Sequence, residues 1–266
     1  MLSNITLGQY YPGSSFLHQM DPRAKILCTM LFIVSIFFAQ SLLSYGIITA
    51  FVLFSIALSR LPVSMIWNSV KPLWVIILFT LAVHMLTTPG TTLWEWGFLR
   101  VTQEGVHQGT LMTGRLIYLI VFSSLLTYTT SPIVLTDGIE HLLNPFRCIG
   151  VPAHELAMMM TIALRFIPTL IEETDRIMKA QTARGASFSG KNLWQRAKSM
   201  IPLLVPLFIS AFRRADDLAT AMEARCYRGG EGRTRLKELH YTFRDSLAGV
   251  VIVLLALSLA FLRWFT

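Results

Sequence analysis

The chain has 266 residues, of which 53% are hydrophobic and 14% charged, and its formal net charge is +8. Soluble domains usually carry about 25% charged residues, so this composition excludes a disordered chain, a coiled coil and a disulfide scaffold. Several apolar runs are long enough to span a bilayer, whereas the alternating segments of an outer-membrane barrel are missing. The composition predicts an all-α, polytopic membrane protein whose partner is a lipid bilayer and not nucleic acid.

Five apolar segments follow one another along the chain as candidate spans. No basic segment leading into a short apolar run opens the chain, so we expect no cleavable signal peptide and expect the first span to direct insertion. The third segment is short for a full crossing, which favours a tilted helix there. The predicted spans are Ala24–Ala39, Leu42–Leu58, Leu73–Leu86, Gly109–Tyr128 and Leu247–Phe265.

The lysines and arginines predict which side of the membrane each loop occupies. With the N-terminus inside, 20 of the 23 basic residues lie on the inner side, and 16 of these fall within residues 130–244. Only Arg100, Arg115 and Arg263 remain on the outer side or at the outer span ends. Because basic loops stay in the cytoplasm, we expect a multi-pass protein of a prokaryotic cell membrane, with its N-terminus and the 130–244 segment cytoplasmic.

The 130–244 segment combines many charges with a helical apolar period. Two long amphipathic helices are predicted over Val151–Arg184 and Leu193–Arg225, after a shorter one near Leu135–Leu143. Their apolar stripes could cover each other, lie on the membrane or pack under the spans, and their charged faces would form a docking platform. The predicted domains are residues 1–129 (tail and four spans), 130–244 (cytoplasmic coupling helices) and 245–266 (last span). The stripes comprise Leu156, Met160, Ala163, Ile167, Leu170, Ile177 and Met178, then Ile201, Leu204, Phe208, Phe212, Ala215, Leu218, Ala219 and Met222.

The spans lack the groups that a self-powered transporter or a membrane enzyme needs. None contains Asp or Glu, and only His84 and Arg115 are ionisable well inside them. The chain has no metalloprotease or esterase motif, and its three cysteines and six histidines show no metal-ligand spacing. We therefore expect no catalytic residue, no bound metal and no cofactor of its own.

One segment approaches a phosphate-binding loop. Gly185–Asn192 reads G-x-x-x-x-G-K-N, with Asn in place of the hydroxyl residue that would bind Mg²⁺. It follows a predicted helix rather than a strand, so we interpret it as a turn with Gly185 ending that helix. A separate small-residue pattern, Gly105, Gly109 and Gly114, opens the fourth span. It permits close helix packing, either within the chain or against a membrane partner.

Two similar triplets end the two amphipathic helices: Ala183-Arg184-Gly185 and Ala224-Arg225-Cys226. An arginine in the last helical turn is favoured by the helix dipole alone, which is the simpler explanation of either one. A guanidinium also presents a rigid fork for a carboxylate. Two such helix ends in one cytoplasmic segment therefore indicate two attachment points, each of which would bind an acidic groove on a partner domain.

With these triplets, and with the opening segments Gly8–Gly13 and Ser15–Lys25, the whole chain resembles the transmembrane T component of energy-coupling factor (ECF) importers. The resemblance implies a non-catalytic scaffold that joins two ABC-type ATPase subunits to a substrate-binding integral membrane S component. The partner ATPases would bind ATP and Mg, and Arg184 and Arg225 would each enter a groove on one of them. Two candidate contacts for the S component stay open, namely the amphipathic helices and the small-residue face at Gly105, Gly109 and Gly114. The opening segment looks more like the shared-module type than the dedicated cobalt or nickel type.

One residue departs from the family pattern, because the second triplet has Cys226 where the family has Gly. A left-handed backbone there would cost a cysteine about 1 kcal/mol or more, and the alternative is that the helix runs on to Gly229 or Gly230. Two other functions stay open on the residues alone. The first is a self-contained secondary transporter using His84 or Arg115, and the second is an enzyme that uses Gly185–Asn192 for a phosphate substrate.

Overall fold

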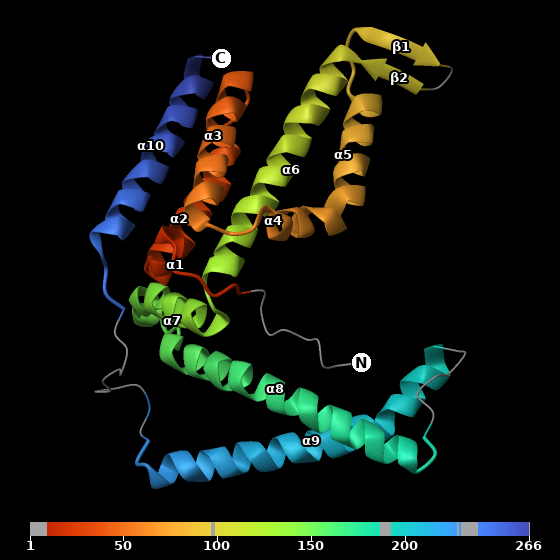
Figure 1. Ribbon diagram of the computed structural model, residues 1–266, viewed down its shortest axis with the longest axis vertical. Helices are drawn as coiled ribbons and strands as arrows, with labels where there is room; N and C mark the ends of the chain where they lie inside the picture. Colours follow the sequence, from red (N-terminus) through yellow and green to blue (C-terminus); the bar gives the residue numbers. More distant parts are fainter. Residues whose placement is uncertain (1–9, 97–98, 187–192, 228, 230–238, 266) are drawn as a thin grey trace. The chain divides into compact units, whose positions relative to one another are not determined.

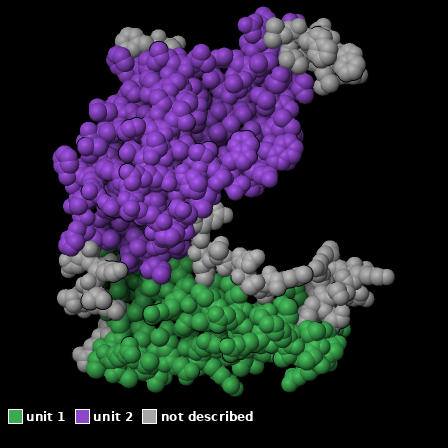
Figure 2. All heavy atoms as spheres, viewed as in Figure 1, with its two compact units in different colours: residues 1–7, 139–238 green, residues 8–138, 239–266 purple. Residues whose placement is uncertain are grey.

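The computed structural model describes residues 10–96, 99–186, 193–227, 229 and 239–265. The chain divides into two compact units, which Figure 2 shows in separate colours. Unit 1 comprises Met1–Leu7 and Ile139–Glu238, and unit 2 comprises Gly8–Gly138 and Leu239–Thr266. Unit 2 is therefore made of two segments of the chain that are separated in sequence by Ile139–Glu238.

Unit 2 is built from helices and one short hairpin (Figure 1). Asp21 caps α2 by accepting a hydrogen bond from the Arg23 N–H, with Pro22 at the first helical position, where its missing N–H costs nothing. Thr102 caps α6 in the same way through the Gly105 N–H. The elements are α1 (Phe16–Gln19), α2 (Pro22–Ile36), α3 (Leu42–Ser59), α4 (Val63–Val70), η1 (Lys71–Leu73), α5 (Trp74–Thr87), β1 (Thr92–Trp96), β2 (Leu99–Thr102), α6 (Gln103–Thr129), most of α7 (Pro132–Leu143) and α10 (Phe243–Phe265).

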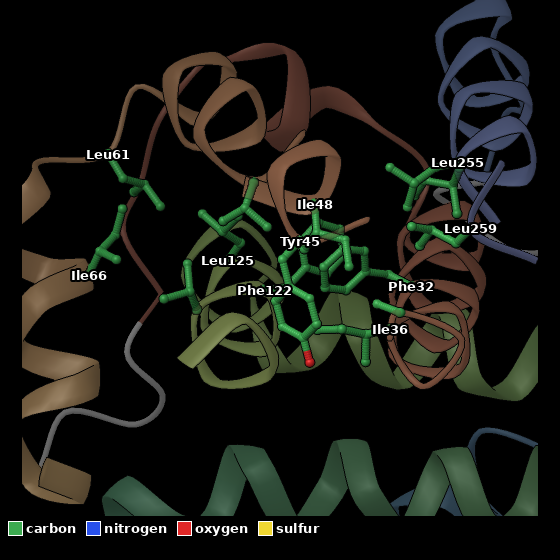
Figure 3. Close-up of a cluster of buried hydrophobic side chains, with 14 of the residues drawn as sticks. Phe32, Ile36, Tyr45, Ile48, Leu61, Ile66, Phe122, Leu125, Leu255 and Leu259 are labelled. Atoms are coloured by element: carbon green, nitrogen blue, oxygen red, sulfur yellow. The ribbon is translucent and has the colours of Figure 1, made fainter. Parts of the chain in front are cut away.

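The core of unit 2 lies where α2, α3, α6 and α10 meet (Figure 3). Phe32 is fully buried and stacks on Phe122, with ring centroids 4.0 Å apart, and on Phe51 at 5.8 Å. Leu259 of α10 is also fully buried in this cluster. Aromatic stacking thus ties the start of the chain to α6, and the last helix closes the cluster.

Glycines on α6 allow α5 and α6 to pack closely against each other. A Cβ added at Gly105 would lie 2.8 Å from the His84 carbonyl oxygen, and one added at Gly109 would lie 3.3 Å from the Leu81 carbonyl oxygen. Side chains would therefore push the two helices apart, which is the reason for small residues at this spacing. The antiparallel hairpin β1–β2 connects the two helices and was not expected from the sequence.

Among the described residues, five helical stretches are long and apolar enough to cross a membrane, which confirms the prediction of an all-α polytopic membrane protein. Four of these stretches overlap the second, third, fourth and fifth predicted spans. The stretch that overlaps the third predicted span consists of α4, η1 and α5 together. The predicted first span, α2, has only 15 residues, about 22 Å at 1.5 Å per residue. The fifth stretch is α8 of unit 1 instead. The five are Leu42–Ser59, Val63–Thr87, Gln103–Thr129, Ala153–Ala183 and Phe243–Trp264.

Unit 1 is dominated by two long antiparallel helices, α8 (Ala153–Ala183) and α9 (Leu193–Ala224), after the short η2 (Asn144–Ile149). The helices continue through Pro168 in α8 and through Pro202 and Pro206 in α9. Gln181 donates to the Pro202 carbonyl at one end of the pair, and Tyr227 donates to the Met158 sulfur at the other. The two predicted amphipathic helices end at Arg184 and Arg225, each one residue beyond the observed C-terminal end of α8 or α9.

The apolar stripes of α8 and α9 are only partly covered within unit 1. Phe208 and Phe212 of α9 are 61% and 67% exposed, and Met160 of α8 is also exposed. Among the residues whose burial is described, the buried apolar side chain of α9 is Leu203, and the buried apolar side chains of α8 are Ala153 and Ala157. The two helices therefore do not bury their stripes against each other, and an apolar surface remains on the pair.

Candidate interaction site at two arginine-bearing helix ends

The first arginine end closes α8 with a Schellman motif. Arg184 is the C-cap residue, and Gly185 follows it in the left-handed conformation, with φ of 86°. The Gly185 N–H donates to the Thr182 carbonyl at 2.9 Å, and the Ala186 N–H donates to the Gln181 carbonyl at 3.0 Å. These are the two hydrogen bonds that define the motif, so the backbone at Arg184 is fixed by the helix end itself.

The second end repeats this geometry at α9. Arg225 follows the last helical residue, and Cys226 is left-handed, with φ of 59°. The Cys226 N–H donates to Glu223 at 2.8 Å, and the Tyr227 N–H donates to Met222 at 3.0 Å. The alternative in which the helix runs on to Gly229 or Gly230 is wrong, because the chain turns at Cys226. Each arginine thus occupies the same position in the same backbone motif.

The two arginine ends lie at opposite ends of the α8–α9 pair (Figure 1). Tyr227, two residues beyond Arg225, reaches Met158, which is 26 residues before Arg184 on α8. At 1.5 Å per helical residue this separates the two arginines by about 40 Å. One small partner surface cannot engage both, whereas two partner domains can take one each.

Both guanidinium groups are exposed, and the described part of unit 1 shows no ion pair for either. Elsewhere on the same helices the charges do pair, since Lys179 lies 2.6 Å from Asp175, and Arg214 lies 3.1 Å from Glu173. The residues beside each arginine are small: Ala183 and Gly185 in one case, Ala224 and Cys226 in the other. A partner surface can therefore close on each arginine without meeting bulky neighbours.

A polar cluster that the sequence analysis missed holds the second end. The Tyr227 hydroxyl lies 3.5 Å from Nε2 of His154, whose Nδ1 lies 3.0 Å from Glu140 Oε1. Glu140, His154 and Tyr227 are 14 and 73 residues apart in sequence, so no local pattern connects them. The cluster fixes the residue that follows Cys226 onto the start of α8, which orients the Arg225 end.

The other predicted site residues belong to unit 2, except for the Gly185–Asn192 segment of unit 1. Of Gly185–Asn192, only Gly185 and Ala186 lie within the described residues, and both belong to the α8 helix end. Gly105 and Gly109 are buried against α5, so the internal-packing interpretation accounts for them. Gly114 is half-buried, and a Cβ there would meet only ordinary contact with Tyr45 at 3.5 Å. The described residues contain no cluster of three or more metal-binding side chains.

The left-handed backbone at Cys226 leads to a stability prediction. The conformation costs a non-glycine residue about 1–2 kcal/mol. The greater freedom of an unfolded glycine offsets about 0.5–1 kcal/mol of this. Cys226→Gly is therefore expected to raise the free energy of unfolding of unit 1 by about 0.5–1 kcal/mol, measured by denaturant titration in detergent. The reciprocal change, Gly185→Cys at the matched position, is expected to lower it, and a shift of both variants in the same direction would contradict the assigned backbone.

The family model described as "CbiQ: Cobalt transport protein" matches residues 13–236. The chain is 62% identical over 264 residues to the energy-coupling factor transporter transmembrane protein EcfT of Acidaminococcus fermentans, covering 99% of this chain and 98% of that protein. Its identity to the proteins of the same name is 54% in Brevibacillus brevis and 46% in Bacillus subtilis, over 99% of this chain and 100% of each relative.

The membrane-capable helices and these comparisons define a multi-pass membrane component of a transporter. More particularly, the chain belongs to the CbiQ/EcfT family, the transmembrane components of energy-coupling factor transporters. The family that the two arginine triplets and the opening segment predicted is thereby confirmed.

Proposed function

We propose that this chain is the non-catalytic coupling subunit of an ATP-driven ECF-type importer of a vitamin or other micronutrient. It joins two ABC-type ATPase subunits to a substrate-binding integral membrane S component and passes the movement of the ATPases to that component. The observation that supports this most directly is the repetition of one helix end at Arg184 and Arg225, about 40 Å apart along an antiparallel pair.

Each arginine end suits a groove with an acidic side chain on an ATPase. The Schellman motifs fix the backbone, so only the long arginine side chain must be ordered on binding. Bidentate pairing of a guanidinium with a carboxylate is among the stronger protein contacts. Two separate attachment points let the two ATPases move relative to each other while both remain bound, and that relative motion turns or tilts α8 and α9.

In this proposal the nucleotide that drives transport is bound by the partner subunits. ATP and Mg belong to the ATPase subunits, and this chain binds no cofactor. The N-terminus and residues 130–244 lie in the cytoplasm, so α8 is not a transmembrane helix despite its hydropathy. Its second half carries Glu172, Glu173, Asp175 and Arg176, which are costly inside a bilayer.

The S component is proposed to contact the exposed apolar side chains of α8 and α9, including Met160, Phe208 and Phe212. On the small-residue face of α6, only Gly114 is left for a partner, because α5 covers Gly105 and Gly109. The opening segment favours a shared module that serves several S components, and the dedicated cobalt or nickel type is the alternative. The self-contained secondary transporter gains no support, since Arg115 is bonded to the Ala39 carbonyl and packed on Phe37.

Purification of the intact complex tests the proposal. The tagged full chain, extracted from its native membrane in mild detergent, is expected to bring down two ATPase subunits and a small membrane protein, identified by mass spectrometry. The purified chain alone in liposomes is expected to show no uptake under an ion gradient. Recovery of the chain without any ATPase, combined with gradient-driven uptake by the chain alone, would contradict the coupling role.

A further inference from the structure

Unit 2 contains a polar cleft that the coupling function does not use. It lies where α2 ends, α3 begins, α6 begins and α10 ends, and Figure 1 shows these helix ends together at one end of unit 2. The cleft has a volume of about 780 Å³. Its polar lining includes Gln40, Tyr45, Glu104, His107, Arg115 and Arg263.

Arg115 is held in place on one wall of the cleft. Its guanidinium donates to the Ala39 carbonyl at 3.2 Å and lies 5.3 Å from the centroid of the Phe37 ring. The guanidinium also forms a weak bond to the Met112 sulfur at 3.5 Å and lies near the Tyr45 side chain, and among the described residues its buried Nε has no hydrogen-bond partner. The side chain is therefore rigid, charged and incompletely satisfied, although α6 is a membrane-capable helix.

Arg263 brings a second cation to the same place from the other end of the chain. Its guanidinium lies 5.6 Å from the centroid of the ring of Phe38, the residue that follows the phenylalanine supporting Arg115. Two arginines that are 148 positions apart in sequence are thus stacked on consecutive phenylalanines at the end of α2. Cation–π contacts hold such groups without neutralising their charge.

The residues that line the cleft provide little negative charge to neutralise these two guanidinium groups. In the described part of unit 2, neither arginine forms an ion pair, and Glu104 is engaged by the Thr91 N–H at 2.7 Å and the Thr91 hydroxyl. The Tyr45 hydroxyl lies beside Arg115 on this wall: Tyr45 is only 7% exposed, and within the described residues its oxygen has no partner at hydrogen-bond distance. An incompletely satisfied cation and a buried polar atom without a partner are both costly, so the cleft favours an anion that accepts hydrogen bonds.

The position of the cleft indicates where that anion comes from. Large apolar side chains are exposed around these helix ends: Leu42 at the start of α3, Phe37 at the end of α2, and Trp264, which is 88% exposed, at the end of α10. Tryptophan at a span end marks the membrane–water interface, the level at which lipid headgroups lie. A phosphate at this depth is most readily supplied by a lipid whose acyl chains cover the apolar side chains.

We propose that this cleft binds the phosphate of an anionic phospholipid headgroup, held by Arg115 and Arg263 with the Tyr45 hydroxyl as a further donor. In the proposed orientation the lipid belongs to the outer leaflet and joins the end of α2 to the starts of α3 and α6 and the end of α10. The planar guanidinium fork matches phosphate oxygens, which an ammonium group would not reproduce.

Lipid binding by the purified full chain tests this site. The chain is delipidated in detergent and titrated with phosphatidylglycerol, phosphatidylcholine or inorganic phosphate, and bound lipid is counted by native mass spectrometry. We expect one tightly bound phosphatidylglycerol, and we expect Arg115→Gln with Arg263→Gln to weaken its binding by about tenfold or more, since hydrogen bonds to charged groups are lost. Arg213→Gln, which removes an exposed charge on α9, is the matched control and is expected to leave binding unchanged.

Tyr45→Phe keeps the site testable if the double variant fails to fold. It removes a hydroxyl that forms no hydrogen bond at normal distance within the described residues, so it is expected to weaken phosphatidylglycerol binding several-fold without lowering the melting temperature of the lipid-free protein. Unchanged binding in Tyr45→Phe and in a folded double variant would overturn the proposal. Equal binding of phosphatidylcholine, or displacement of the lipid by an equal concentration of inorganic phosphate, would also overturn it.

Discussion

Replacing both Arg184 and Arg225 with alanine is expected to abolish attachment of the ATPases and ATP-dependent uptake, while insertion of the chain into the membrane is unchanged. Truncating one partner of a buried interfacial charge pair typically costs about 2–5 kcal/mol. Either single variant keeps one attachment point, so it is expected to retain ATPase at reduced affinity, and the double variant loses both points. Co-purification of the ATPases and uptake in proteoliposomes are the two measurements.

The controls separate attachment from folding. Both arginines are exposed and lie at helix ends, so their side chains support no core, and the yield and helicity of the double variant should equal those of the unchanged chain. Arg213→Ala removes a charge from the middle of α9 and is expected to leave attachment intact. Full ATP-dependent uptake by the Arg184→Ala, Arg225→Ala variant would refute the role assigned to the two helix ends.

Asp245→Ala is expected to destabilise unit 2 by about 3–5 kcal/mol, because it removes a buried carboxylate that accepts three hydrogen bonds. Asp245 is fully buried. One carboxylate oxygen accepts the Asp21 N–H at 2.7 Å, and the other accepts the N–H and the hydroxyl of Thr242 at 2.8 Å and 2.6 Å. Alanine would leave the buried Asp21 N–H without an acceptor, would remove both bonds to the exposed Thr242, and would release the start of α10 from the start of α2.

Unfolding of the purified chain in detergent, followed by circular dichroism, measures this effect. Asp217→Ala, at an exposed position on α9, is the matched control, and its effect should stay within about 0.5 kcal/mol. Lys25 is expected to lose support as well, because it is buried and the negative charge of Asp245 acts on its ammonium group. A loss no larger than that of the control would contradict the anchoring role of Asp245.

The sequence predicted the helices of this protein well because their apolar residues recur with a local period. The predicted second span, Leu42–Leu58, differs from α3 (Leu42–Ser59) by one residue, and both amphipathic helices end within one residue of the predicted position. The fourth span begins earlier than predicted, at Gln103, because Glu104 and Gly105 fall in the first turn of α6, where caps and small residues disguise the helix.

The elements that the sequence did not predict depend on residues far apart in the chain. The hairpin β1–β2 lies between two spans and is only nine residues long in its paired strands, so its alternation carries little signal. Asp245 was placed outside the last predicted span, and nothing near it in sequence indicates that it binds the Asp21 backbone 224 residues away. The cleft likewise depends on Arg115 and Arg263 stacking on neighbouring phenylalanines of α2.

The sequence by itself determined the membrane class, the positions of most long helices and the pair of arginine triplets, since each is encoded within a turn or two of helix; the short α1 and α4 were not predicted. Only the tertiary structure decided that Cys226 takes the left-handed turn that Gly185 takes, that the two arginines stand at opposite ends of an antiparallel pair, and that Gly105 and Gly109 face α5. These features depend on which helices pack together, and packing is set by contacts between distant residues that no local pattern specifies.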